Sequence, residues 1–459
     1  MPYVGEIANH ESLRRIRESQ AIRELENRFR LKNISGTDIV KNQFLSSNDL
    51  PDSNSSIHYV ITIDGSNLAI NPEKSYPSAE YCYLTVASVI LDMQIIKTTS
   101  QERFPDPIKL RGAKKTTSFE GVLPGCNVLL DNESDDKSSL RRVLFEMLQK
   151  HTLFTEGENL LETYEYLLKY RIENAGSKPK SPIPGFEDKD LEYGFGVYQC
   201  KYSGRDLFST DAMRLHELLN PVGSSGEMYN QIMSVIEKLT LINILRNFEK
   251  MGWLYLLRHT AFVIDGPLAV FSVASWLAGA ISKELERINN TQKQISGQDM
   301  LILGIEKTGL FATHFEQLDR VTGRDYTFGE GAITPNSILL LNDDYIKKHI
   351  KPSTSEKPYG QDTYFGRKIL YKTKLGHRIV PVLCCFNDNQ RDITICEINQ
   401  FSRLKDVTTL LDELSSNRYA NSISALIAAH AEAAIPLNLG TKIFEKMAKE
   451  FKKESINNV

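Results

Sequence analysis

Two kinds of hydrophobic pattern alternate along the chain. Short apolar runs rich in β-branched and aromatic residues predict strands at 59–63, 83–91, 261–264, 300–305, 379–386 and 393–398. Apolar positions spaced three and four apart predict helices at 9–32, 139–150, 157–173, 227–251, 267–288, 418–435 and 440–453. Strands mixed with helices in this order indicate an α/β fold in which a mixed sheet is flanked by helices.

The same pattern divides the chain into one ordered domain and its flanking segments. Residues 1–57 are predicted to form a helical arm and a loop, and residues 437–459 a basic C-terminal helix. Residues 58–436 form the α/β domain. A polar, irregular stretch at about 130–225 interrupts this domain, and we interpret it as a largely helical insertion.

One apolar stretch resembles a membrane span. From Ala261 to Ile281 the only charged side chain is Asp265. Because Asp265-Gly266-Pro267 divides this stretch, we predict a buried strand, a turn and then a helix with Pro267 in its first turn, and no membrane association. The six cysteines lack CxxC spacing and the N-terminus lacks a signal peptide, so we expect reduced thiols and a cytoplasmic protein.

The net charge of −3 provides no overall attraction to a polyanion, so any nucleic-acid binding relies on local basic clusters. Three such clusters are Lys109, Arg111, Lys114 and Lys115; Lys347, Lys348 and Lys351; and Arg367, Lys368, Lys372, Lys374 and Arg378. Aromatic residues among the last cluster suit a single strand, through phosphate contacts and base stacking. A solvated surface explains each cluster equally well.

Two apolar runs end in the same dipeptide. The run 60–63 leads into Asp64-Gly65, and the run 261–264 leads into Asp265-Gly266. Two carboxylates at strand ends can meet, and paired carboxylates suit Mg²⁺ or Mn²⁺, which prefer oxygen ligands. The alternatives are a simple Asp-Gly turn at Asp64 and a helix N-cap at Asp265.

A third carboxylate is expected from the helix that precedes the second motif. Val235, Leu239, Ile242 and Leu245 form an apolar stripe on that helix, and Glu249 falls on the same face. A carboxylate on a buried stripe needs a partner, and a metal ion is one. The alternative is a Glu249 that reaches solvent or pairs with Arg246 or Arg258.

Three further residues are candidates for the same site. His430 lies in line with apolar positions of its helix, so its imidazole is expected to point inward. Tyr419 lies at the start of that helix, and Lys307 follows the strand that ends at Ile305, where it can contact phosphate. Ordinary packing of His430 and Tyr419 and a solvated Lys307 are the alternatives.

These motifs together resemble those of the NurA nucleases. The resemblance rests on Ile63-Asp64-Gly65-Ser66, Glu249, Ile264-Asp265-Gly266, Ile305-Glu306-Lys307-Thr308 and Ala428-Ala429-His430-Ala431-Glu432. It covers about residues 59–436. It implies an RNase H-like fold, Mn²⁺- or Mg²⁺-dependent cleavage of DNA, a homodimer, and a HerA-type hexameric ATPase as partner, in DNA end processing or antiviral defence.

Under this resemblance Asp64, Glu249 and Asp265 bind the metal ions, and His430, Lys307 and Tyr419 complete the site. A second hypothesis keeps the fold but makes the chain a DNA-guiding adaptor of the ATPase without useful catalysis. A third is a sugar-kinase or actin-like ATPase, which also begins with a strand and Asp-Gly. The chain has no GxxxxGK[ST], GxGxxG, GxSxG or HExxH motif, which argues against mononucleotide hydrolysis, hydride transfer and zinc proteolysis.

Overall fold

The computed structural model describes residues 11–28, 43–52, 56–71, 78–100, 114–174, 176, 178–320, 331–415, 421 and 423–434. They belong to two compact units, Met1–Asn42 and Gln43–Val459. In the first unit the single helix predicted at 9–32 is two helices, α1 (Glu11–Glu18) and α2 (Gln20–Arg28). Ser19 separates them because its hydroxyl accepts a hydrogen bond from the amide of Ile22 and so caps α2.

The second unit is built on a nine-stranded mixed sheet in the order β1-β9-β10-β11-β8-β7-β2-β3-β4. Its strands are β1 (Leu45–Ser46), β2 (Tyr59–Ile70), β3 (Tyr81–Asp92), β4 (Lys114–Pro124), β7 (Thr260–Asp265), β8 (Leu301–Glu306), β9 (Ser337–Leu340), β10 (Gly366–Lys372) and β11 (Arg378–Cys384). Strands β2, β3 and β4 form an antiparallel meander, β7 pairs parallel with β2, and β8 pairs parallel with β7. This arrangement is the RNase H-like topology, so the predicted fold class is confirmed.

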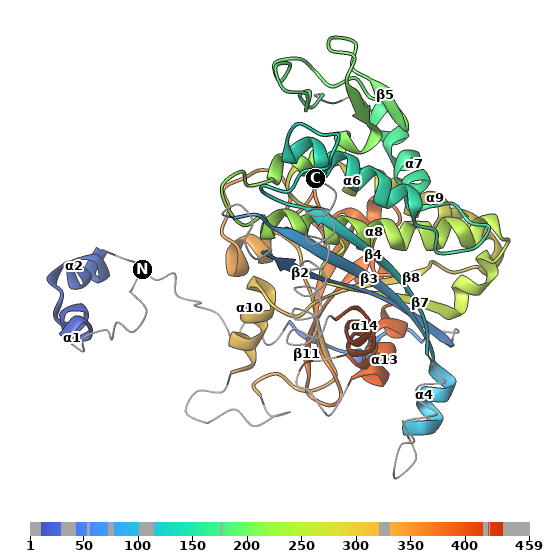
Figure 1. Cartoon of the computed structure of the whole chain (residues 1–459). Coiled ribbons are helices and arrows are strands. Elements are labelled where there is room, and N and C mark those ends of the chain that lie inside the picture. Colours follow the sequence, from blue (N-terminus) through green and yellow to red (C-terminus); the bar gives the residue numbers. More distant parts are fainter. Residues whose placement is uncertain are drawn as a thin grey trace. The chain divides into compact units, whose positions relative to one another are not determined.

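Helices cover both faces of the sheet (Figure 1). On one face lie α6 (Asp136–Lys150), α7 (Leu160–Glu173), α8 (Gly226–Lys250) and α9 (Trp276–Ser296), and on the other lie α13 (Leu404–Leu414) and α14 (Ser424–Ala433). Along β2, Ile61 and Ile63 face the first group of helices and Val60 faces the second, as the strand period of two requires. The remaining elements include α4 (Met93–Ser100), α10 (Leu310–Asp319), α11 (Asp343–Tyr345), α12 (Asp388–Arg391) and a two-stranded sheet of β5 (Val197–Gln199) and β6 (Asp206–Phe208).

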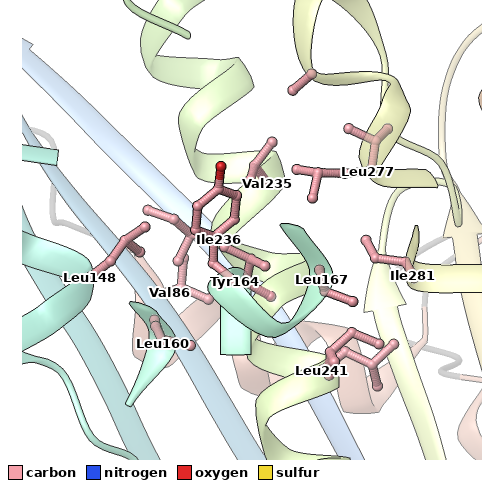
Figure 2. Packing of buried hydrophobic residues seen from close by; sticks show 14 of the residues in the cluster. Val86, Leu148, Leu160, Tyr164, Leu167, Val235, Ile236, Leu241, Leu277 and Ile281 are labelled. Carbon is pink, nitrogen blue, oxygen red and sulfur yellow. The ribbon is translucent and has the colours of Figure 1, made fainter. Parts of the chain in front are cut away.

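Helices α6 and α7 lie in the stretch that the sequence suggests as an insertion, yet they contribute to the main core. Tyr164 and Leu167 of α7 are fully buried in the same cluster as Ile236 of α8 and Val86 of β3 (Figure 2). The hydroxyl of Tyr164 donates to the carbonyl oxygen of Ser209 at 2.8 Å. This stretch therefore buries part of the sheet rather than merely extending from it.

Three further expected elements are wrong or displaced, one of them the helix predicted at 418–435, which begins only at Ser424. The strand predicted at 393–398 is absent: residues 393–394 form a turn, in which the carboxylate of Asp392 accepts hydrogen bonds from the amide and hydroxyl of Thr394, and Ile398 begins a 3-10 helix. The helix predicted at 267–288 begins only at Trp276. Pro267 instead belongs to an extended segment that folds over β8, where Gly304 leaves room for the Gly266 carbonyl oxygen.

The third basic cluster is also corrected. Arg367, Lys368 and Lys372 point into the protein from β10 and are at most 5% exposed. Lys372 forms an ion pair with Asp319 at 2.9 Å, and both side chains are fully buried. These cations are structural, since a buried charge requires a partner. Among the described residues, no helix is long and apolar enough to span a membrane.

Candidate active site

Asp64 and Asp265 lie on neighbouring parallel strands. The pairing of β2 with β7 sets Ile63 opposite Ile264, which places the two aspartates next to each other on the same face of the sheet. Both line one cavity of about 620 Å³. The expected meeting of these two carboxylates is therefore present in the structure.

Asp64 occupies the middle of a strand rather than its end. Strand β2 continues to Ile70 and is paired with β3 throughout, with Asp64 opposite Ala87. The turn interpretation of Asp64 is wrong, because β2 stays paired with β3 beyond Asp64, although its other neighbour, β7, ends at Asp265. Asp265 does end its strand, but no helix follows directly, so its N-cap interpretation is wrong as well.

Glu237 of α8 brings a third carboxylate to this cavity, and the sequence analysis missed it. A Cβ atom at Gly65 would lie 2.8 Å from Oε1 of Glu237 and 2.6 Å from Cγ of Met233. Gly65 therefore lets the helix and its carboxylate approach β2 beside Asp64. The signal in the sequence is the adjacent pair Glu237-Lys238 within an otherwise apolar part of the helix.

Glu249 does not join the two aspartates. It lies 12 positions after Glu237, about 18 Å further along α8. Its carboxylate accepts two hydrogen bonds from Arg287, at 2.9 and 2.6 Å. Glu284 binds Arg287 at 2.8 Å and Arg246 at 2.7 Å, so Glu249 belongs to an ion-pair network between α8 and α9. Of the two interpretations of Glu249, the alternative of an ion pair is right in kind, but the partner is Arg287 rather than Arg246 or Arg258.

The clustering of carboxylates changes their ionisation. Burial, and then the negative charges of Asp265 and Glu237, raise the pKa of Asp64 to about 7, against the opposing effect of Lys307 and His430. Burial also raises the pKa of Glu237, although the ammonium of Lys238 opposes the shift from 2.9 Å. The clustered carboxylates of this cavity therefore favour the binding of a cation.

His430 reaches this cluster from α14. Its Nδ1 lies 3.1 Å from Oδ2 of Asp64, a contact that joins helix and sheet across 366 positions of sequence. The imidazole is 62% exposed, so the expectation that it points inward was wrong. The buried face of α14 carries small residues such as Ala429 and Ala433 instead, and His430 lies at its edge, open to solvent on one side.

Lys307 also reaches the cluster. It follows β8, and its ammonium donates to Oδ2 of Asp265 at 2.9 Å while 39% of the side chain stays exposed. The structure thus brings Lys307, His430 and the two aspartates together. Tyr419 lies outside the described residues.

Aromatic residues also line this cavity. Phe271, Phe311, Tyr359 and Tyr364 line it together with Glu306 and Lys368. Lys368 pairs with Glu306 at 2.7 Å and lies 3.6 Å from the centre of the Phe311 ring. The sequence analysis did not identify this part of the cavity, because residues from β8, α10 and β10 meet there only through the fold.

The donor set fits a hard divalent cation by its chemistry, since Asp64, Glu237 and Asp265 line one cavity and all offer oxygen. Among the described residues, no group of three or more acidic, histidine or cysteine side chains is arranged as a ready metal site. Each carboxylate is instead held by a nitrogen group: Asp265 by Lys307, Glu237 by Lys238 and Asp64 by His430. Metal binding would require these contacts to rearrange.

The fold and the cavity define an RNase H-like α/β protein with an acidic candidate active site at the centre of its sheet. The model of the NurA domain matches residues 58–435. The match covers most of the chain, so the chain belongs to the NurA family of nucleases.

Solved structures of NurA proteins are also similar to this chain. The NurA nuclease from Sulfolobus solfataricus is 13% identical, with 98% of each chain covered and a TM-score of 0.34. A NurA crystallised with manganese is 12% identical, with 93% of this chain and 96% of the other covered and a TM-score of 0.24. No curated protein sequence matches the chain.

Proposed function

We propose that this chain is a Mn²⁺- or Mg²⁺-dependent deoxyribonuclease in which Asp64, Glu237 and Asp265 hold the metal. The observation that carries the proposal is that Asp64, Glu237 and Asp265 line one cavity, where burial and the charges of the other two carboxylates raise the pKa of Asp64 to about 7. Such a cluster is costly unless a cation compensates it. Glu237 takes the place that the resemblance gave to Glu249.

The residues around the cluster suit phosphodiester hydrolysis. A bound divalent cation would stabilise the charge that develops on the phosphate oxygens in the transition state. Lys307, partly exposed at the cavity, is placed to contact a non-bridging phosphate oxygen once it releases Asp265. His430 faces solvent and Asp64 at once, so it can hold or transfer a proton between water and the site.

The test is cleavage of end-labelled linear DNA with Mn²⁺, Mg²⁺ or chelator by the wild type and by Asp64→Asn and Asp265→Asn. We expect each substitution to slow cleavage roughly 10³-fold or more, since loss of a metal ligand removes several kcal/mol of transition-state stabilisation. Circular dichroism checks that each variant is folded. A folded variant that cleaves DNA at the wild-type rate would remove that residue from the proposed metal site.

The same assay separates the nuclease from the adaptor hypothesis. A DNA-guiding adaptor would bind DNA but would show no metal-dependent cleavage, even in the wild type. The carboxylate cluster favours the nuclease, because guiding DNA needs no buried negative charge. Calorimetric titration with Mn²⁺ gives a second readout, in which the wild type binds and Asp64→Asn binds weakly.

We further propose that the nuclease works as a homodimer with a HerA-type hexameric ATPase, in DNA end processing or antiviral defence. This rests on membership of the NurA family together with two properties of the chain. It has no GxxxxGK[ST] loop for a nucleotide, and its net charge of −3 gives no long-range capture of DNA. A separate motor would supply DNA to the cavity.

A further inference from the structure

A second cavity, of about 600 Å³, has several cationic and aromatic residues in its lining. Its positive residues are Arg171, Lys178, Arg214, Lys283 and Arg391. Among its described lining residues Asp362 is the one carboxylate, and it already pairs with Lys357 at 2.9 Å. The lining residues therefore carry a positive surplus, although two of these cations, Arg214 and Arg391, pair with carboxylates outside the lining.

This cavity, hereafter the basic cavity, forms between two parts of the chain. Arg171, Lys178 and Arg214 come from the stretch at about 130–225, and the first turns of α9 form another wall. A Cβ atom at Gly279 of α9 would meet no described atom within 4 Å, so this side of the helix borders open space. The N-terminal end of α9 adds its partial positive charge to the cations.

The cations differ in how firmly they are held. Arg391 is fixed by Glu286 at 2.8 Å and by Asp388 at 3.0 Å. Lys178 and Lys283 are exposed, and among the described residues neither has a carboxylate within ion-pair distance. These two lysines are therefore the best placed to neutralise phosphates.

The basic cavity adjoins the cavity lined by Asp64, Glu237 and Asp265, hereafter the carboxylate cavity, because Tyr364 lines both. Trp276 and Tyr193 add aromatic surface to its wall. Cations combined with aromatic side chains are typical of sites that bind single strands, whose bases are free to stack. A duplex keeps its bases paired inside, where Trp276 cannot reach them.

We propose that the basic cavity binds a single DNA strand next to the bond that is cut, with Lys178 and Lys283 on its phosphates and Trp276 against a base. The proposal rests on the proposed nuclease function, and it gives the stretch at about 130–225 a role in holding substrate. Neither the family match nor the carboxylate cluster requires such a site.

The two tryptophans of the chain allow a local test. Trp253→Phe leaves Trp276 as the only indole, and we expect an oligothymidylate, added in chelator to prevent metal-dependent cleavage, to quench its fluorescence in a saturable way. The converse variant Trp276→Phe retains Trp253, which does not line the basic cavity, and should show little quenching. Absence of quenching in the Trp253→Phe protein would overturn the proposal.

Charge reversal tests whether Lys178 and Lys283 contact the phosphates of the strand. In the Trp253→Phe background, Lys178→Glu with Lys283→Glu should weaken oligothymidylate binding by about tenfold or more. The slope of log K against log salt concentration should become shallower by about 1.4, since each phosphate contact on a single strand contributes about 0.7 to this slope. Lys150→Glu with Lys250→Glu changes the net charge equally on lysines outside the basic cavity. Equal weakening by both pairs would mean general electrostatics and would overturn the proposal.

The two proposals fail in different ways. Oligothymidylate binding that quenches Trp276, without metal-dependent cleavage of any DNA, would reject the nuclease and retain the basic cavity. Cleavage that depends on Asp64 and Asp265, without quenching of Trp276, would reject the basic cavity and retain the nuclease.

Discussion

The carboxyl group of Asp64 is buried and lies beside two other carboxylates, and this placement makes the stability of the metal-free protein depend on pH. Its pKa rises from an ordinary 3.8 to about 7 in the folded protein. Between these values the folded state binds more protons than the unfolded chain, so the free energy of unfolding falls as pH rises through this window. Below pH 3.8 the effect is absent, and above pH 7 the loss is complete.

Asp64→Asn tests this directly, because an amide cannot ionise. In chelator, the free energy of unfolding of the variant minus that of the wild type should be clearly larger at pH 8 than at pH 5. Urea unfolding at the two pH values measures the difference. A stability difference that is the same at both pH values would mean that Asp64 keeps an ordinary pKa in the folded protein.

At the scale of elements, helix α8 carries two glutamates with different partners. Glu237 faces the carboxylate cavity at Gly65, whereas Glu249 pairs with Arg287 of α9. Glu237→Gln should therefore reduce DNA cleavage by about 10² to 10³-fold, since it removes a metal ligand. It should also lower stability, because it leaves the buried ammonium of Lys238 without its carboxylate partner.

Glu249→Gln is the matched control on the same helix. It should leave the cleavage rate within about twofold of wild type and lower stability by roughly 1 kcal/mol, because the ion pair with Arg287 is partly exposed. The measurements are cleavage rates at saturating Mn²⁺ and urea unfolding. The opposite result, an inactive Glu249→Gln and an active Glu237→Gln, would restore Glu249 to the site.

At the scale of the whole molecule, the proposed partner supplies what the chain lacks. The chain has no GxxxxGK[ST] loop and a net charge of −3, and in the proposed assembly the ATPase would bring DNA to its cavity. We expect it to co-purify as a dimer with a HerA-type hexamer when the two are co-expressed, and ATP to accelerate its cleavage of long linear DNA. Size-exclusion chromatography with light scattering measures the mass. No complex at micromolar concentration, with full activity in the absence of ATP, would leave a self-sufficient nuclease.

The sequence was sufficient wherever the information was local. An apolar run of β-branched residues makes a strand almost regardless of context, so the cores of β2, β3, β7, β8 and β11 were predicted correctly, as were helices α6, α7 and α8. The repeated Asp-Gly after two such runs identified Asp64 and Asp265 as neighbours. Polar strands such as β4 and β10 were missed, because their lysines and threonines resemble loop or surface residues until partners bury them.

Only the tertiary structure decided which other residues join these aspartates. Helical periodicity shows that a glutamate lies on a buried face, but it does not show where along the helix the sheet comes closest. That point is set by Gly65, which admits Glu237 and leaves Glu249, about 18 Å away, to Arg287. Likewise His430 meets Asp64 because α14 packs on β2. Contacts between residues hundreds of positions apart follow from the packing of whole elements, and no local pattern encodes them.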